Sequence, residues 1–328
     1  MPRHTTETVM PINANIMPKQ EIIPFHQGYL VVPGGHQLYF AEYGQPDGPV
    51  AVVLHGGPGS GCNVSMLDWF DLSRLRVVLL DQRGAGRSKP AGCLQHNTTQ
   101  DLIGDLECLR TTLKIRQWLV VGGSWGSALG VCYAGAYPEA VCGLVLRGVF
   151  LASEREMIWF FQSLRAMVPD AWGHLTMGWH RTERGAVLQS LTRMLQNGTL
   201  AQQQDAALRW SQYEQAVIQK MLGISTLQSN EESVAETAKY RLQAHYLSNL
   251  CFLTERTIFR RARRTIGIPI IIVHGTHDLI CPPENVMRLL RFMPHAQVQW
   301  VDKGTHTSSD PAIRDALQCA ITQLTERM

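Results

Sequence analysis

The segment VGGSWGS, residues 121–127, places one serine between small residues. The apolar run WLVV comes just before the glycines, and a segment rich in alanine and glycine follows. A strand that turns sharply into a helix needs small residues on both sides of the turn, and such a turn lifts the serine hydroxyl clear of the sheet. The pattern therefore predicts that Ser124 is a nucleophile at a strand-to-helix elbow. The competing interpretation is a tight turn with an inactive serine.

A neutral serine is a poor nucleophile, so it needs a base that is itself held by an acid. Asp278 follows the strand-like run IPIIIVHG, and His306 follows the run QVQWVD. The chain order serine, aspartate, histidine is typical of serine hydrolases built on an open parallel sheet. We therefore expect His306 to be the base of Ser124 and Asp278 to orient it.

Neighbouring residues compete for these two roles. His277 is the nearest alternative base, but it adjoins the predicted acid instead of following the last strand. Asp302 is an alternative acid, although it lies close to His306 in sequence and is also suited to capping that loop. We interpret His274, at the end of its strand, as structural.

Acyl transfer through a serine also needs donors for the developing oxyanion. The backbone N–H of Trp125 is one candidate, and Gly57 in the loop HGGPG is the other, because glycine brings bare backbone close to a reacting group. The loop DQRGAGRS resembles a catalytic loop. We instead expect Asp81 and Arg83 to form a partly buried ion pair that ties adjacent loops together.

The elements that position these residues alternate between strands and helices, and continuous Val/Leu runs predict a parallel sheet covered on both faces. Predicted strands span 28–32, 37–44, 50–56, 76–84, 118–123, 143–148, 268–275 and 297–302. Predicted helices span 98–113, with Thr98 or Thr99 as N-cap, 124–138, about 283–292, and a last one from about 310. The candidate residues follow strands, where function gathers in open α/β sheets.

The alternation is interrupted once. Residues 151–265 are rich in Trp, Gln, Met and Arg and show helical periodicity without clear buried strands. We expect a tail at 1–24, a first part of the α/β core at 25–150, a helical cap at 151–265, and a second part of the core at 266–328. The predicted fold class is thus α/β, with a mostly parallel central sheet and a helical cap domain.

Composition limits the partners and cofactors. With 45% hydrophobic and 17% charged residues, the chain is typical of soluble globular proteins. Its net charge of +3 is too small to indicate nucleic-acid binding, and we interpret the arginine cluster at 260–264 as a solvated helix end. No segment is apolar enough to cross a membrane, and the N-terminus lacks the apolar core of a signal peptide.

The cysteines and histidines predict no metal site and no cofactor. None of the eight cysteines forms a CxxC pair, and no Cys/His cluster has zinc-ligand spacing. Unpaired cysteines favour a reducing, cytoplasmic setting. We expect a small peptide or another small molecule as the partner, and the sequence assigns no oligomeric state.

Several of these motifs together resemble a known family. The segments HGGPGSG, DQRGAGRS, GGSWGSALGVCYAGAYPEAV, LVLRGVF, HGTHDLICPPEN and GTH are similar to those of the proline iminopeptidases, which belong to the α/β-hydrolases. The resemblance extends from about residue 28 to about residue 306. It implies a cofactor-free cytoplasmic serine peptidase with a helical cap, in which Ser124, Asp278 and His306 are the triad and Gly57 and Trp125 supply the oxyanion donors.

The resemblance also implies a subsite in the cap where carboxylates bind the substrate's free ammonium. Glu214, in WSQYE, matches the first family glutamate, whereas Gln243, in RLQAHYL, stands where the second is expected. The family pattern further places Arg147, in LVLRG, near these carboxylates. With one carboxylate fewer, Arg147 would be able to neutralise Glu214, and the pocket would then no longer favour a cation.

Three functions follow from these residues. The first is a serine hydrolase that releases an N-terminal residue, preferably proline, from small peptides or amides through an acyl-enzyme. The second keeps the same triad in an esterase, thioesterase or amidase that acts on a small metabolite, and Gln243 motivates it. The third, a catalytically silent ligand-binding module, is disfavoured by the complete triad. A carboxylate in place of Ser124 would have indicated epoxide hydrolase or dehalogenase chemistry.

Overall fold

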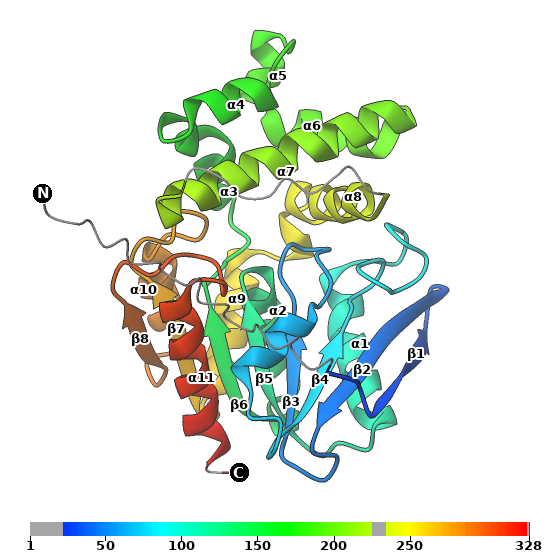
Figure 1. Ribbon diagram of the computed structural model, residues 1–328, viewed down its shortest axis with the longest axis vertical. Helices are drawn as coiled ribbons and strands as arrows, with labels where there is room; N and C mark the ends of the chain where they lie inside the picture. The colour runs from blue at the N-terminus through cyan, green and yellow to red at the C-terminus, as the bar shows by residue number, and fades with distance from the viewer. Residues whose placement is uncertain (1–21, 225–233, 327) are drawn as a thin grey trace, which may run out of the picture.

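A computed structural model describes residues 22–224, 234–326 and 328. Its centre is one eight-stranded sheet with the order β1-β2-β4-β3-β5-β6-β7-β8 (Figure 1). β2 pairs antiparallel with both β1 and β4, and every other pairing is parallel, which confirms the predicted mostly parallel sheet. The strands are β1 (His26–Val32), β2 (His36–Gly44), β3 (Val50–Leu54), β4 (Arg76–Leu80), β5 (Trp118–Gly123), β6 (Val141–Arg147), β7 (Ile270–Gly275) and β8 (Gln297–Val301).

Helices cover both faces of the sheet, as the buried runs predict. One face packs against α1 (Thr99–Thr112), α2 (Trp125–Ala134), α9 (Glu255–Ala262) and α10 (Glu284–Leu290). The other face packs against α11 (Pro311–Thr325) and a short 3-10 helix at Val64–Trp69. Adjacent residues of β5 alternate between the two cores, Val120 in the first and Val121 in the second, because successive side chains of a strand point to opposite faces.

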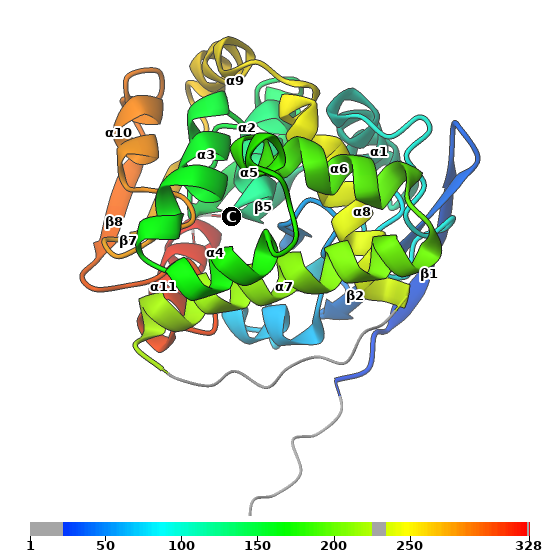
Figure 2. The same cartoon turned by 90° about the horizontal axis from the view of Figure 1, so that it is seen from above.

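A further layer of helices lies over the carboxyl ends of the parallel strands (Figure 1). This cap consists of α3 (Glu154–Ile158), α4 (Pro169–Leu175), α5 (Arg181–Gly185), α6 (Val187–Asn197), α7 (Leu200–Leu222) and α8 (Val234–Ser248). α6, α7 and α8 pack against one another across the top of the sheet (Figure 2). α9, which lies inside the segment predicted as cap, packs against α2 beside the sheet.

Local chemistry explains where the helices begin. Thr98 caps α1 and exchanges hydrogen bonds with Asp101 in a capping box, which satisfies two backbone N–H groups at the helix start. Ser153 and Glu156 do the same for α3 at the entry to the cap. Within the described ranges, no helix is both long enough and apolar enough to cross a bilayer.

The expected ion pair between Asp81 and Arg83 is wrong. Asp81 instead pairs with Arg87, at 2.8 Å between Oδ2 and Nε, and accepts the N–H of Cys62. Arg83 forms a bidentate pair with Asp105 of α1, at 2.6 and 2.7 Å. Asp81 therefore holds the loop to itself and to Cys62, whereas Arg83 holds it to α1.

Candidate active site

The serine elbow is strained in the way that the motif requires. Ser124 joins β5 to α2 with φ 56° and ψ −123°, a backbone conformation that L-residues rarely adopt. A Cβ on Gly122 would lie 2.2 Å from the carbonyl oxygen of Gly126, and one on Gly126 would lie 2.1 Å from that of Leu54. Only glycine fits at these two positions, so the elbow depends on the motif itself.

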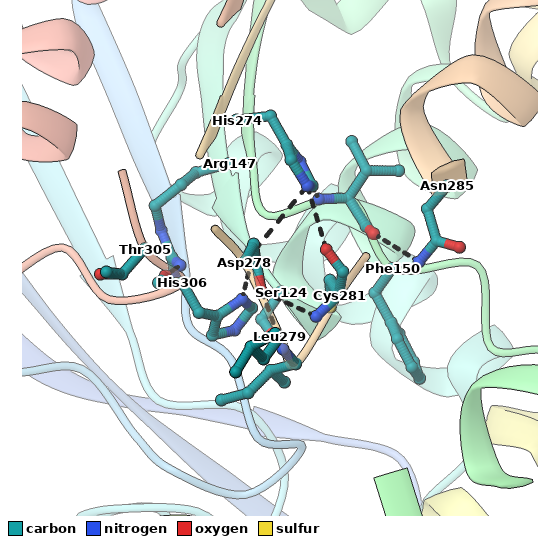
Figure 3. A network of polar contacts seen from close by, with 12 residues as sticks. Ser124, Arg147, Phe150, His274, Asp278, Leu279, Cys281, Asn285, Thr305 and His306 are labelled. Atoms are coloured by element: carbon teal, nitrogen blue, oxygen red, sulfur yellow. Dashed lines mark hydrogen bonds and ion pairs between the residues drawn. The ribbon is translucent and has the colours of Figure 1, made fainter. Parts of the chain in front are cut away.

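The candidate acid and base meet beside this elbow (Figure 3). His306 Nδ1 lies 2.7 Å from Asp278 Oδ2, and Asp278 Oδ1 accepts the backbone N–H groups of Ile280 and Cys281 at 3.0 and 2.8 Å. Burial by itself would raise the pKa of Asp278, but the facing His306 and these donors favour the carboxylate and hold its pKa below the ordinary value. The structure thus gives Asp278 the charge that an orienting acid needs.

Ser124 and His306 line the same cavity. Across the described residues no hydrogen bond joins the Ser124 hydroxyl to His306, and the hydroxyl lies beside the Cys281 thiol. In serine hydrolases the hydrogen bond between the serine hydroxyl and the histidine is often long without substrate and shortens when substrate binds. The nucleophile and the base therefore line one cavity, and we expect their hydrogen bond to form in the substrate complex.

The competing residues lie elsewhere. His277 and Asp302 are exposed. His274 is fully buried, accepts the N–H of Val149 at Nδ1, and lies 3.0 Å from the carbonyl oxygen of Cys281 through Nε2 (Figure 3). Burial lowers the pKa of His274, so it stays neutral behind Asp278 and suits the structural interpretation.

The two candidate oxyanion donors also border the cavity. Trp125 is the first residue of α2, where a backbone N–H has no partner within the helix and the helix dipole favours negative charge. Gly57 has φ 108°, and a Cβ there would lie 2.8 Å from Ser60 Oγ. Bare backbone is thus obligatory at Gly57, as the sequence indicates.

The cap supplies the other end of the cavity, which measures about 290 Å³. Glu214 of α7 accepts hydrogen bonds from Tyr240 Oη, at 2.8 Å, and from Gln243 Nε2, at 2.5 Å, both on α8. Gln243 is 5% exposed, and among the residues that the structure describes its Oε1 has no hydrogen-bond partner. Glu214 and Gln243 therefore both line the cavity, while the Gln243 Oε1 atom is itself buried.

Arg147 does not pair with Glu214. Its Nη1 donates to the backbone carbonyl of His306, and its Nε has no partner in the described part of the chain (Figure 3). Desolvation lowers the pKa of Arg147, while the negative charge of Asp278 opposes this shift. Arg147 thus supports the loop of His306, and the interpretation that it neutralises Glu214 finds no support in the geometry.

Two residues around Glu214 escaped the sequence analysis. Tyr240 binds Glu214 directly, and the Lys239 ammonium lies 3.3 Å from Tyr240 Oη and 3.7 Å from Glu236. Both precede Gln243 by three or four positions, the spacing that puts helical residues on one face. This spacing could have identified both residues from the sequence, because the segment was already expected to be helical.

The described residues contain no group of three or more His, Cys, Asp or Glu side chains placed to hold a metal ion. A strained serine, a histidine hydrogen-bonded to a buried carboxylate and two backbone donors are the parts that acyl transfer requires.

Comparison with known proteins identifies the family. The α/β hydrolase fold family matches residues 49–311. Proline iminopeptidases from Xylella fastidiosa strain 9a5c and Xanthomonas citri are 39% and 40% identical over 302 and 299 residues, and each alignment covers at least 90% of this chain and 96% of the relative. This chain belongs to the proline iminopeptidase family. The resemblance found in the motifs is thereby confirmed, and the chain is a hydrolase of the serine type.

The relatives extend beyond bacteria, and solved structures share the fold. The proline iminopeptidase of Arabidopsis thaliana is 37% identical over 302 residues, covering 91% of this chain and 80% of the relative. A proline iminopeptidase-related protein from Thermus thermophilus superposes with a TM-score of 0.58 at 22% identity, covering 92% of this chain and 99% of that one. At this identity, the similarity to the Thermus thermophilus structure shows a shared fold and nothing more.

Proposed function

We propose that this protein releases an N-terminal residue, preferably proline, from small peptides or amides through an acyl-enzyme on Ser124. One observation carries the proposal: Glu214, hydrogen-bonded to Gln243, lines the same cavity as Ser124. A free ammonium entering a desolvated pocket needs an opposite charge and hydrogen-bond acceptors, and Glu214 offers both.

In the proposed reaction, Ser124 Oγ attacks the scissile carbonyl carbon while His306 takes the hydroxyl proton. Trp125 and Gly57 donate their backbone N–H groups to the resulting oxyanion. The tetrahedral intermediate then collapses, the C–N bond breaks, and His306 gives its proton to the leaving amine. Water repeats the sequence on the acyl-enzyme, so the N-terminal residue leaves with a new carboxylate and Ser124 regains its proton.

Asp278 would act by orienting His306 and stabilising the imidazolium that forms in each half-reaction. Its low pKa supports this role, because the carboxylate must stay ionised while the histidine gains its proton. Arg147 would hold the carbonyl of His306 from behind, so that the ring keeps its direction toward Ser124.

The walls of the cavity suit a compact apolar residue. Phe160, Phe161, Ile218 and Leu247 line it alongside the polar groups. A proline ring is apolar and compact, and its secondary ammonium still offers two N–H donors to the Glu214 carboxylate. The names of the relatives agree with this substrate, and they favour it over the esterase, thioesterase and amidase hypothesis.

The deciding experiment compares a prolyl arylamide with its N-acetylated form. We expect turnover of the first and about a hundredfold lower kcat/KM for the second, because acetylation removes the charge that Glu214 binds. Labelling by a fluorophosphonate, present in the wild type and lost in Ser124→Ala, checks the nucleophile. Equal cleavage of both arylamides would overturn ammonium recognition and leave a general amidase or esterase.

The cytoplasm is the proposed setting. All eight cysteines are unpaired, and four of them are only partly buried, which supports a compartment that keeps thiols reduced.

A further inference from the structure

A buried glutamine connects the two loops that carry the candidate oxyanion donors. Gln82 follows β4 and is 4% exposed. Its backbone N–H donates to His55 Nε2 at 3.0 Å, and its side-chain Nε2 donates to the His55 carbonyl at 3.0 Å. Its Oε1 accepts the indole N–H of Trp125 at 2.9 Å. One side-chain amide thus binds the loop of Gly57 and the first residue of α2 together.

Gln82 holds His55 at two points, and His55 sets the direction of the Gly57 donor. The backbone N–H of Gln82 donates to His55 Nε2, so the ring proton resides on Nδ1, which donates to the Gly56 carbonyl at 2.9 Å, while the Gln82 side chain holds the His55 carbonyl itself. The Gly56 carbonyl belongs to the same planar trans peptide as the Gly57 N–H, and the two groups point in opposite directions. A ring that holds the Gly56 carbonyl therefore sets where the Gly57 N–H points.

The bond to Trp125 acts on the second donor. The indole is fully buried, and its ring packs against Tyr246 of α8 at 5.3 Å between centroids. With Nε1 held by Gln82, the Trp125 side chain is anchored at its polar end as well as its apolar face. The backbone N–H of the same residue is then fixed relative to the loop of His55.

We propose that Gln82 is a positioning residue that sets the two oxyanion donors at the spacing the tetrahedral intermediate needs. The inference rests on the proposed acyl transfer at Ser124 and adds the residue that aligns its electrostatic stabilisation. A neutral amide suits this place, since it offers a donor to His55 and an acceptor to Trp125 at once. A glutamate would turn a carboxylate oxygen toward the His55 carbonyl and put negative charge beside the oxyanion.

The first variant is Gln82→Met, which keeps the length of the side chain and the backbone bond to His55 Nε2, and removes the side-chain bonds to the His55 carbonyl and from the Trp125 indole. We expect kcat on a prolyl arylamide to fall about a hundredfold, because displacements of about an ångström have effects of that size. KM should stay within about threefold, since neither His55 nor Gln82 lines the wall of Glu214. The rate at which a fluorophosphonate labels Ser124 should fall in parallel with kcat.

A second variant removes one bond only. Trp125→Phe deletes the indole N–H and leaves the bond from Gln82 to His55. We expect it to lower kcat by about tenfold, and the double variant should be no slower than Gln82→Met, because residues that act as a unit are not additive. Multiplicative effects in the double variant would contradict the shared role.

The matched control is Asn285→Leu. Asn285 is an equally buried amide that donates to the Val149 carbonyl at 3.0 Å and to the Glu156 carboxylate at 2.7 Å, and no hydrogen bond joins it to His55 or Trp125 within the described residues. It should lower the melting temperature as much as Gln82→Met while changing the labelling rate less than about threefold.

The outcomes separate the two proposals. If Gln82→Met lowers only the melting temperature and leaves the labelling rate of Ser124 unchanged, Gln82 is purely structural and this inference is overturned. If the wild type labels at Ser124 but does not turn over the prolyl arylamide, the proposed substrate is wrong. The labelling rates still decide the role of Gln82, because fluorophosphonate labelling needs the oxyanion donors and not the ammonium subsite.

Discussion

The reaction end of the cavity and its amine end draw on different parts of the chain. At the reaction end, Ser124, Asp278 and His306 follow strands of the sheet, and backbone groups hold the acid in place. At the amine end, Glu214 and Gln243 face each other from two cap helices, and only side chains connect them. The first end is held by the central sheet, whereas the second depends on how α7 packs against α8.

This difference separates chemistry from selectivity. A polar group just past a parallel strand is held mainly by the sheet, because the ladder of backbone hydrogen bonds determines where the strand ends. The charge balance of the amine end depends on single side chains, among them Lys239, two hydrogen bonds away from Glu214. We therefore expect variants at the reaction end to change kcat and variants at the amine end to change KM and substrate preference.

The largest expected effect is at the reaction end. Ser124→Ala and His306→Ala should each lower kcat on a prolyl arylamide by about 10⁴–10⁶-fold, and the double variant should be no slower than either one. Steady-state kinetics with active-site titration measures this. Unchanged turnover in His306→Ala would contradict the assignment of His306 as the base.

At the amine end, Glu214→Gln should raise KM and lower kcat/KM about a hundredfold for the free-amine substrate, since removing one charge of a desolvated pair costs roughly 2–5 kcal/mol. For the N-acetylated substrate, which carries no charge, the same variant should change kcat/KM less than about threefold. Equal losses for both substrates would show that Glu214 serves the reaction end instead.

Gln243→Glu sharpens the comparison by adding charge. A second carboxylate should lower KM for the free-amine substrate about tenfold, because charge-assisted hydrogen bonds are roughly twice as strong as neutral ones. Two adjacent carboxylates raise each other's pKa, so the gain should appear as pH rises and vanish in mild acid. A pH series of KM for wild type and variant tests this, and an unchanged KM at every pH would contradict it.

Lys239→Met removes a positive charge from the same wall. We expect KM for the free-amine substrate to fall about fivefold, a modest effect because Glu236 lies 3.7 Å from the lysine and solvent screens it. The acetylated substrate is the control and should be unaffected. A rise in KM would instead show that Lys239 keeps Tyr240 in place.

The smallest effect concerns stability. Burial lowers the pKa of His55 and His274 below the ordinary 6.5, so below about pH 6.5 the unfolded chain binds more protons than the folded one, and the free energy of unfolding falls as pH falls. Burial raises the pKa of Glu156, which opposes this trend. The melting temperature should therefore fall less between about pH 7.5 and about pH 5.5 in His274→Gln than in the wild type. The glutamine amide can replace both hydrogen bonds of the histidine ring.

An equal loss of melting temperature in His274→Gln and in the wild type would show that His274 does not carry this dependence. His274 is the better of the two histidines for this test, because His55 also holds the Gly56 carbonyl beside the reaction end.

Most of the fold followed from the sequence. Each predicted strand overlaps a strand of the sheet, and Thr98 is the cap of α1, because alternating burial and capping are local properties of a few neighbouring residues. The same locality explains why the elbow at Ser124 was recognisable: its glycines are required by atoms within the motif and the adjoining strand. Asp278 and His306 were found because strand ends mark the edge of the sheet where they meet.

The partners of the charged residues were decided by the tertiary structure alone. Arg83 binds Asp105 instead of Asp81, Arg147 binds the carbonyl of His306 instead of Glu214, and Gln82 joins two loops that lie far apart in sequence. Which side chain reaches which neighbour depends on the rotation of each helix and the register of each strand, and those are set by packing over the whole molecule. The sequence by itself therefore determined what reaction this protein has the groups to perform, while only the folded chain decided how its donors and charges are aligned to perform it.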